Sequence, residues 1–192
     1  MDYADKNTQI KKELCNDKRF YVDQRNLDRL MNGAYYDGYS VNDIKVGDIL
    51  RYWQGYIYSL YETRVFSYLN NTAEGRKKYK EYVDICGNVS FRSERQYEIL
   101  IEEIRKNPYD IKKGAIFINQ YNFILEGQHR CCILLKSYGP DYKIKVVRLN
   151  QHMNSTTIRH MRFLIKLQIA KIKNCMTIHR MKKIRANGYC LK

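Results

Sequence analysis

The stretch around Gly127 constrains the fold more than any other, because its hydrophobic pattern changes there from that of strands to that of a helix. Residues 115–118 and 121–125 are short apolar runs separated by Asn119-Gln120, which predicts a β-hairpin with a tight turn. A short helix is predicted directly after the glycine turn, over Cys131–Ser137. A chain with this pattern must place a strand end against a helix start.

The flanking segments extend this pattern into a mixed unit. Ser93 is placed to cap an amphipathic helix, and Asn107-Pro108 ends it. The apolar face of this helix consists of Tyr97, Leu100, Ile101 and Ile104. A third strand is predicted over residues 143–149. The order helix, hairpin, glycine turn, helix and strand predicts an α+β fold with a small mixed sheet and helices.

The turn Glu126-Gly127-Gln128-His129-Arg130 carries residue types that bind phosphate. Glycine adopts backbone conformations closed to other residues and leaves room for a ligand. The N–H groups that follow lie unpaired at a helix N-terminus, at the positive end of the helix dipole, where an anion is favoured. His129 and Arg130 add charge-assisted donors. The alternative is a plain strand-to-helix turn with incidental polar residues.

The run Phe123–Arg130, the helix after it, Gly139 and the strand at Ile144–Leu149 together resemble the ParB/sulfiredoxin superfamily. The resemblance is firm over residues 93–149 and weak over residues 41–70. It implies a ParB/sulfiredoxin-like fold in which the glycine turn holds the phosphates of a nucleotide. The phosphate-binding residues that it implies are Gly127, Gln128, His129 and Arg130.

The branches of this superfamily differ in function. Sulfiredoxins place a catalytic cysteine where this chain has Gln128, and Cys131 lies beyond Arg130, so reduction of a sulfinic acid is not expected. Partition proteins add a helix-turn-helix, which the segment after residue 150 does not suggest. Two further branches remain, and a group with Asp-Gly-Gln-Arg-type turns serves in DNA defence or modification. The resemblance is closest in type to the other branch, the small kinases similar to free-serine kinases. It implies phosphorylation of a hydroxyl on a small metabolite or sugar, with ATP or ADP and Mg²⁺.

Kinases of this branch use a carboxylate from an early loop as base, and Glu62 lies at roughly that position. Phosphoryl transfer needs a group that orients the hydroxyl and charges that neutralise the phosphates. Glu62 is thus the candidate base, and Arg64 a candidate phosphate contact. Glu126 is a second candidate, for Mg²⁺ or the substrate hydroxyl, and His129 is a donor or general acid/base. The alternatives are a surface ion pair at Glu62 and a plain helix cap at Glu126.

The positive charge is concentrated at one end of the chain. The net charge is +15, yet residues 142–192 contain 13 Lys and Arg and no Asp or Glu. This asymmetry predicts an anionic partner for that segment, such as nucleic acid, an acidic glycan or anionic lipid. It also supports an alternative function, a ParB-like nucleic-acid-binding protein of partition, DNA-modification or nuclease type. A solvated basic tail, and a scaffold that binds nucleotide only structurally, are the remaining alternatives.

Three parts are expected along the chain. Residues 1–40 are an N-terminal arm, loosely structured with one or two short helices, residues 41–150 are the nucleotide-binding core, and residues 151–192 are a basic C-terminal segment. In the last part a basic amphipathic helix is favoured after Ser155, with residues 180–192 frayed or docked on a partner.

The chain is expected to be cytoplasmic. No apolar run approaches the ~20 residues that a bilayer span needs, and the N-terminus has no apolar leader. The six cysteines form no C-x-x-C pair, so neither a disulfide framework nor a zinc site is expected.

Overall fold

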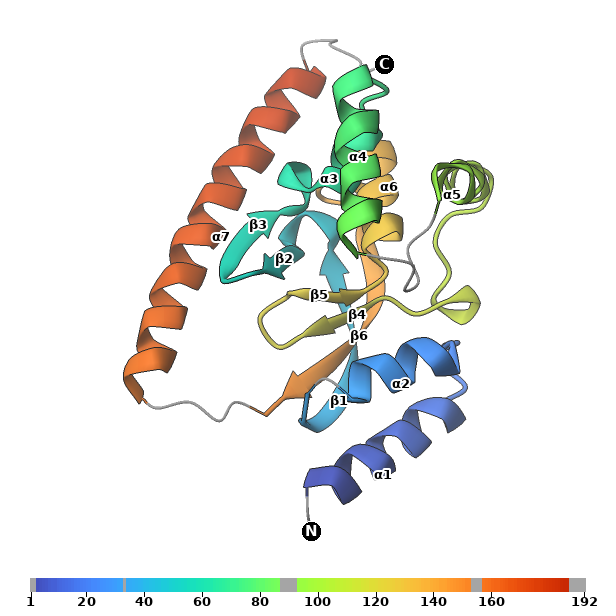
Figure 1. Ribbon diagram of the computed structural model, residues 1–192, viewed down its shortest axis with the longest axis vertical. Helices are drawn as coiled ribbons and strands as arrows, with labels where there is room; N and C mark the ends of the chain where they lie inside the picture. Colours follow the sequence, from blue (N-terminus) through green and yellow to red (C-terminus); the bar gives the residue numbers. More distant parts are fainter. Residues whose placement is uncertain (1–2, 33, 87–92, 153–156, 187–192) are drawn as a thin grey trace.

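Two long strands, β1 (Tyr36–Lys45) and β6 (Lys143–Gln151), pair in antiparallel fashion at the centre of the computed structural model, which describes residues 3–32, 34–86, 93–152 and 157–186. The predicted hairpin is present as β4 (Phe117–Asn119) and β5 (Ile124–Glu126), but Asn119 belongs to β4, so the tight turn predicted at Asn119-Gln120 is wrong and the turn follows Asn119. It extends the sheet because β4 runs parallel to β6, giving the order β1-β6-β4-β5. The prediction of an α+β fold with a small mixed sheet is confirmed (Figure 1).

Four helices pack together on this sheet. The helix α5 (Glu94–Lys106) begins at a capping box that Ser93 forms with Gln96 and ends at Asn107, as predicted. The helix α6 (Gln128–Tyr138) is buried from Cys131 to Leu135, and α3 (Arg64–Tyr68) and α4 (Ala73–Cys86) pack beside it. Their apolar side chains form one core with those of β1, β4, β5 and β6.

The N-terminal segment folds onto the sheet. The two predicted helices are α1 (Tyr3–Asn16) and α2 (Gln24–Asn32). The prediction of a loosely structured arm is wrong, because Leu14 and Leu27 are buried in a cluster with Phe117 of β4. The strand β1 begins at Tyr36, so it crosses the boundary expected at residue 40.

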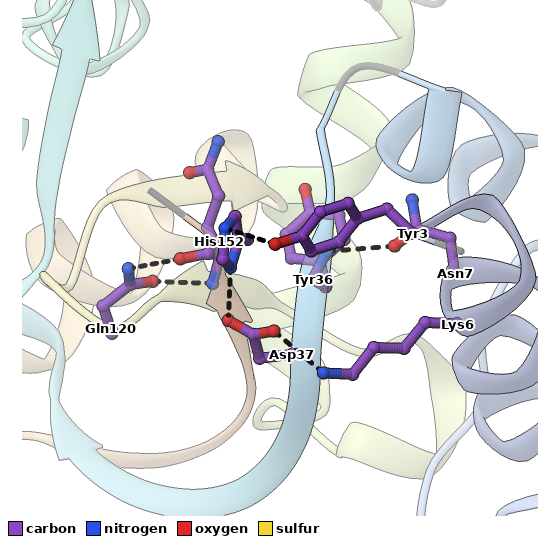
Figure 2. A network of polar contacts seen from close by, with 8 residues as sticks. Tyr3, Lys6, Asn7, Tyr36, Asp37, Gln120 and His152 are labelled. Atoms are coloured by element: carbon purple, nitrogen blue, oxygen red, sulfur yellow. Dashed lines mark hydrogen bonds and ion pairs between the residues drawn. The ribbon is translucent and has the colours of Figure 1, made fainter. Parts of the chain in front are cut away.

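Polar contacts fix α1 against the sheet, as Figure 2 shows. The Asn7 side chain accepts a hydrogen bond from the Tyr36 N–H at 2.9 Å and donates to the Met31 carbonyl at 3.1 Å. His152, just after β6, lies 2.9 Å from the Tyr3 hydroxyl and 3.1 Å from a carboxylate oxygen of Asp37. These bonds join the first helix to both long strands.

The basic segment forms the predicted helix, α7 (Thr157–Ala186), which lies along one edge of the molecule in Figure 1. Leu167 is buried against Leu50 and Phe123, and the Asn174 side chain donates to the Gly47 carbonyl at 2.8 Å. The helix is continuous to Ala186, so fraying from residue 180 onward is wrong for the described part, and residues 187–192 lie outside it. Among the described helices, none is both long enough and apolar enough to cross a membrane.

A separate β-hairpin lies between α7 and the helices α3 and α4. It consists of β2 (Leu50–Trp53) and β3 (Tyr56–Ser59), with Gln54-Gly55 at the turn. Both turn residues have positive φ, 48° and 82°, a combination that suits the twist of a two-residue hairpin. The hairpin is followed by a short 3₁₀ helix, Leu60–Glu62, which leads into α3.

Candidate functional site

Gly127 turns the chain from β5 into α6 at a φ of 94° and a ψ of 19°, in the left-handed region that favours glycine. A Cβ atom here would lie 2.8 Å from Cγ1 of Ile116, so the Ile116 side chain fills the space beside the glycine. The prediction that this glycine leaves room for a ligand is therefore wrong. The helix begins at Gln128, earlier than the predicted Cys131, since the Gly127 carbonyl already accepts from the Cys131 N–H at 3.0 Å.

The first turn of α6 has no side-chain cap, because its N-cap residue is a glycine. Its leading N–H groups lack the acceptor that a Ser, Thr, Asp or Asn would supply. The side chains that follow point in different directions, since successive residues of a helix are rotated by about 100°. Gln128 lines one cavity, Arg130 lines another, and His129 packs among tyrosines.

The cavity at Gln128, here called the arginine cleft, has a volume of about 280 Å³. The hairpin β2–β3, the turn before α3, the helix α4 and the start of α6 all contribute to its walls. Its charged and amide side chains are Arg51, Gln54, Glu62, Arg64 and Gln128, and its aromatic side chains are Trp53, Tyr58 and Tyr82. The structure thus brings together three of the residues singled out from the sequence: Glu62, Arg64 and Gln128.

The two arginines give this cleft its positive charge. The Arg51 guanidinium lies 5.2 Å from the centre of the Trp53 ring and donates to the Ile124 carbonyl at 3.4 Å. Arg64 is exposed at the start of α3. Within the described ranges neither arginine forms an ion pair with a carboxylate. Two cations against the single carboxylate of Glu62, beside an uncapped helix N-terminus, leave a local positive field that attracts anions.

Glu62 has a structural contact as well as a place in the cleft. One of its carboxylate oxygens accepts from the Ser59 N–H at 2.7 Å, within a capping box. This bond fixes the side chain at the entrance of the 3₁₀ helix. The alternative of a surface ion pair between Glu62 and Arg64 is not what the structure shows, since neither residue is ion-paired in the described part of the chain.

His129 packs against tyrosines and does not line the arginine cleft. Its Nε2 atom lies 3.0 Å from the Tyr79 hydroxyl, and its ring meets the Tyr97 ring edge-on with centroids 4.8 Å apart. Tyr79 and Tyr97 are fully buried, and burial raises the pKa of Tyr97 well above its usual range. His129 therefore links the start of α6 to α4 and α5.

Glu126 and Arg130 line a second cavity of about 560 Å³, near α2 and α5. The Arg130 guanidinium donates to the carbonyls of Gly114 and Ala115, the latter at 3.1 Å. Glu126 forms an ion pair with Arg29 at 2.8 Å. The structure therefore does not bring these two site candidates to the arginine cleft, and among the described residues it contains no group of three or more metal-ligating side chains.

The adjacent cysteines of α6 are core residues. Cys131 and Cys132 are fully buried. Burial raises the pKa of both thiols, that of Cys132 to about 12 and that of Cys131 further still. Buried thiols whose pKa is raised in this way are unreactive, so both cysteines are packing residues.

Sequence reasoning missed the residues that the hairpin supplies, namely Arg51, Trp53 and Tyr58. In the observed register Arg51 lies opposite Tyr58, and Trp53 opposite Tyr56. A signal was available, because Gln54-Gly55 joins two aromatic segments of strand character. Alternation along β2 then places Arg51 and Trp53 on one face. What the sequence could not show is that this face meets Gln128.

Comparisons of this chain with protein-family models, with curated proteins and with solved structures gave no match.

Proposed function

We propose that this chain is a nucleotide-dependent phosphotransferase that binds the phosphates of ATP or ADP in the arginine cleft. The observation that carries the proposal is the pair Arg51 and Arg64, which face the cleft without a carboxylate partner in the described residues. Arginines of this kind form strong charge-assisted bonds to phosphate oxygens. The uncapped first turn of α6 and the Gln128 amide add further donors.

The aromatic walls of the cleft suit a nucleoside. Trp53 is 39% exposed at the mouth, and Tyr58 and Tyr82 lie on the same cavity. A nucleobase stacks on such rings, and stacking contributes about 1–3 kcal/mol per base where it has been measured on nucleic acids. Because the cleft is at the small end of ligand pockets, the phosphates occupy its interior and the base lies over Trp53.

The transfer step assigns a role to Glu62. An acceptor hydroxyl at the cleft attacks the terminal phosphorus, a new O–P bond forms, and the bond to the nucleotide's leaving oxygen breaks. The hydroxyl proton passes to the free carboxylate oxygen of Glu62, while Arg51 and Arg64 neutralise the phosphate charge. Mg²⁺ supplies additional charge neutralisation when it is bound with the nucleotide. Such a cation would be held mainly by phosphate oxygens, since Mg²⁺ needs few protein carboxylates.

The proposed fold is of the ParB/sulfiredoxin type. Its support is the element order over residues 93–149, namely α5, the β4–β5 hairpin, Gly127, α6 and β6. Gln128, directly after the glycine, lines the arginine cleft, and this supports a phosphate site beside the turn. The acceptor is a hydroxyl on a small metabolite or sugar.

Fluorescence of Trp53, the chain's sole tryptophan, tests binding directly. Titration with ATP, ADP and CTP in the presence of Mg²⁺ is expected to quench or shift its emission. Arg64→Ala should weaken binding by about tenfold, because it removes a charge-assisted contact from an exposed position. Arg95→Ala, which removes an exposed arginine from α5 instead, is the matched control and should bind as the parent does.

Transfer is tested with Glu62→Gln, because the amide oxygen can still accept from Ser59 and the capping box is kept. The variant should bind nucleotide normally but release ADP from ATP about 100-fold more slowly in the presence of a panel of small hydroxyl compounds. Nucleotides that leave Trp53 emission and the thermal midpoint unchanged would contradict the proposal. Equal affinity in the parent and Arg64→Ala would also contradict it.

A further inference from the structure

The helix α7 carries apolar side chains on the face turned away from the protein. Leu167 and Asn174 are buried on its inner face. On the outer face a row of large apolar side chains is 49–68% exposed, and we call this row the α7 stripe. The α7 stripe consists of Met161, Ile165, Ile169, Ile172 and Met176. Spacings of three and four residues keep these side chains on one line along the helix.

A row of basic side chains runs alongside the α7 stripe. Its members are Arg162, Lys166, Lys173 and Arg180, all of them exposed. Nowhere in the described ranges does one of these four form an ion pair. Since α7 contains no acidic residue, the outer face combines apolar surface with uncompensated positive charge. A helix face that only contacts water is usually polar, so a continuous row of exposed apolar side chains indicates a binding surface.

The β2–β3 hairpin extends this surface. An open groove of about 450 Å³ lies between the hairpin turn and α7, and Tyr56, Lys166, Ile169 and Lys173 line it. Tyr56 is 67% exposed. Its ring therefore stands next to the basic row and the α7 stripe. Tyrosine, with its apolar ring and polar hydroxyl, is enriched at membrane–water interfaces.

We propose that the outer face of α7, with Tyr56, binds the surface of an anionic lipid bilayer. The apolar side chains of the α7 stripe enter the boundary between head groups and acyl chains, and the basic row contacts the lipid phosphates. The helix lies parallel to the membrane while its inner face stays packed on the protein. This inference does not rest on the nucleotide proposal, since it uses none of the residues of the arginine cleft.

The charge and the apolar side chains of the outer face favour a lipid bilayer over a second copy of the chain and over nucleic acid. A second copy of the chain would bring two helices without acidic residues face to face, so like charges would meet in either orientation. Nucleic acid would satisfy the basic row but would leave the exposed isoleucines and methionines in water. A bilayer with anionic head groups is the partner that accepts both halves of the surface, and a ridge at the edge of the molecule suits a flat partner (Figure 1).

Vesicle flotation with the full chain tests this proposal, using vesicles of phosphatidylcholine alone and of phosphatidylcholine mixed with phosphatidylserine. Binding is expected to the mixed vesicles and to be weak without phosphatidylserine. The double variant Lys166→Gln and Lys173→Gln should lower the partition coefficient by roughly 30-fold. The double variant Ile165→Gln and Ile172→Gln should lower it by at least about tenfold. Both pairs are exposed, so the fold is kept.

The matched control removes the same charge elsewhere. Lys77→Gln with Lys80→Gln, on the exposed face of α4, should bind vesicles as the parent does. Absence of binding to the anionic vesicles would overturn the proposal, as would equal loss in the control. Salt-sensitive binding of duplex DNA without vesicle binding would assign the surface to nucleic acid. Self-association that Ile165→Gln with Ile172→Gln abolishes, again without vesicle binding, would assign it to a second copy.

Discussion

The two cavities beside the glycine turn contain similar residue types but differ in how their charges are satisfied. In the second cavity Arg130 donates to two backbone carbonyls, and Glu126 is paired with Arg29. In the arginine cleft, Arg64 has neither an ion pair nor a hydrogen bond to protein in the described chain, and Arg51 has no ion pair and a single long bond, 3.4 Å, to the Ile124 carbonyl. The difference teaches that a charged motif residue is available to a ligand only where the fold leaves its charge unsatisfied. Groups already bonded to protein stabilise the fold instead.

Substitution of Gly127 should have the largest effect, because this residue sets the geometry of both cavities. Gly127→Ala forces a side chain into the left-handed region and against Ile116, and we expect a loss of about 4 kcal/mol in the free energy of unfolding. Chemical denaturation of the variant and the parent measures this difference in the free energy of unfolding.

Gly55→Ala is the control that separates the two causes. Its φ of 82° is similar, but a Cβ atom there would meet nothing within 4 Å. It should therefore lose only about 1 kcal/mol, the cost of the backbone conformation alone. Equal losses in the two variants would show that contact with Ile116 is not what requires glycine at residue 127.

Arg130→Ala should have the next largest effect, and on stability rather than on binding. Loss of the guanidinium leaves the Gly114 and Ala115 carbonyls without these donors, at about 2 kcal/mol in the free energy of unfolding. Nucleotide affinity of the folded protein, measured by Trp53 emission, should not change. The resemblance to the ParB/sulfiredoxin superfamily implies instead a loss of binding, since it makes Arg130 a phosphate-binding residue. A variant that keeps its stability but loses nucleotide binding would move the phosphate site to the second cavity.

Sequence patterning could predict the elements near the glycine turn, because each depends on local signals. Ser93 with Gln96 determines where α5 begins, and the polar residues after Ile118 mark the β4–β5 hairpin, although β5 begins only at Ile124 and the turn is longer than predicted. The packing of α1 and α2 could not be predicted in the same way. Their apolar side chains are few and widely spaced, and they become a core only when Phe117 and Leu149 of the sheet cover them.

Only some residues of the candidate site could be predicted, because the site also depends on contacts between parts of the chain that are remote in sequence. A motif names neighbours in sequence, but a helix rotates successive side chains by about 100°. Gln128 therefore shares a cavity with Arg64, which is remote in sequence, and not with Arg130. Arg51 enters the site through hairpin register, which depends on long-range packing of Leu50 against Phe123 and Leu167.

The smallest expected effect is that of Glu126→Gln. This variant tests whether the main partner of Glu126 is Arg29 or a metal ion. Glu126→Gln removes a partly exposed ion pair with Arg29, so the free energy of unfolding should fall by about 0.5 kcal/mol. Arg29→Gln should cause the same loss, because it breaks the same pair. The Mg²⁺ dependence of nucleotide binding, measured by Trp53 emission with and without a chelator, should be the same in both variants as in the parent. If Glu126→Gln alone abolished that dependence, Glu126 would be a metal ligand, and the nucleotide would have to extend from the arginine cleft across the glycine turn.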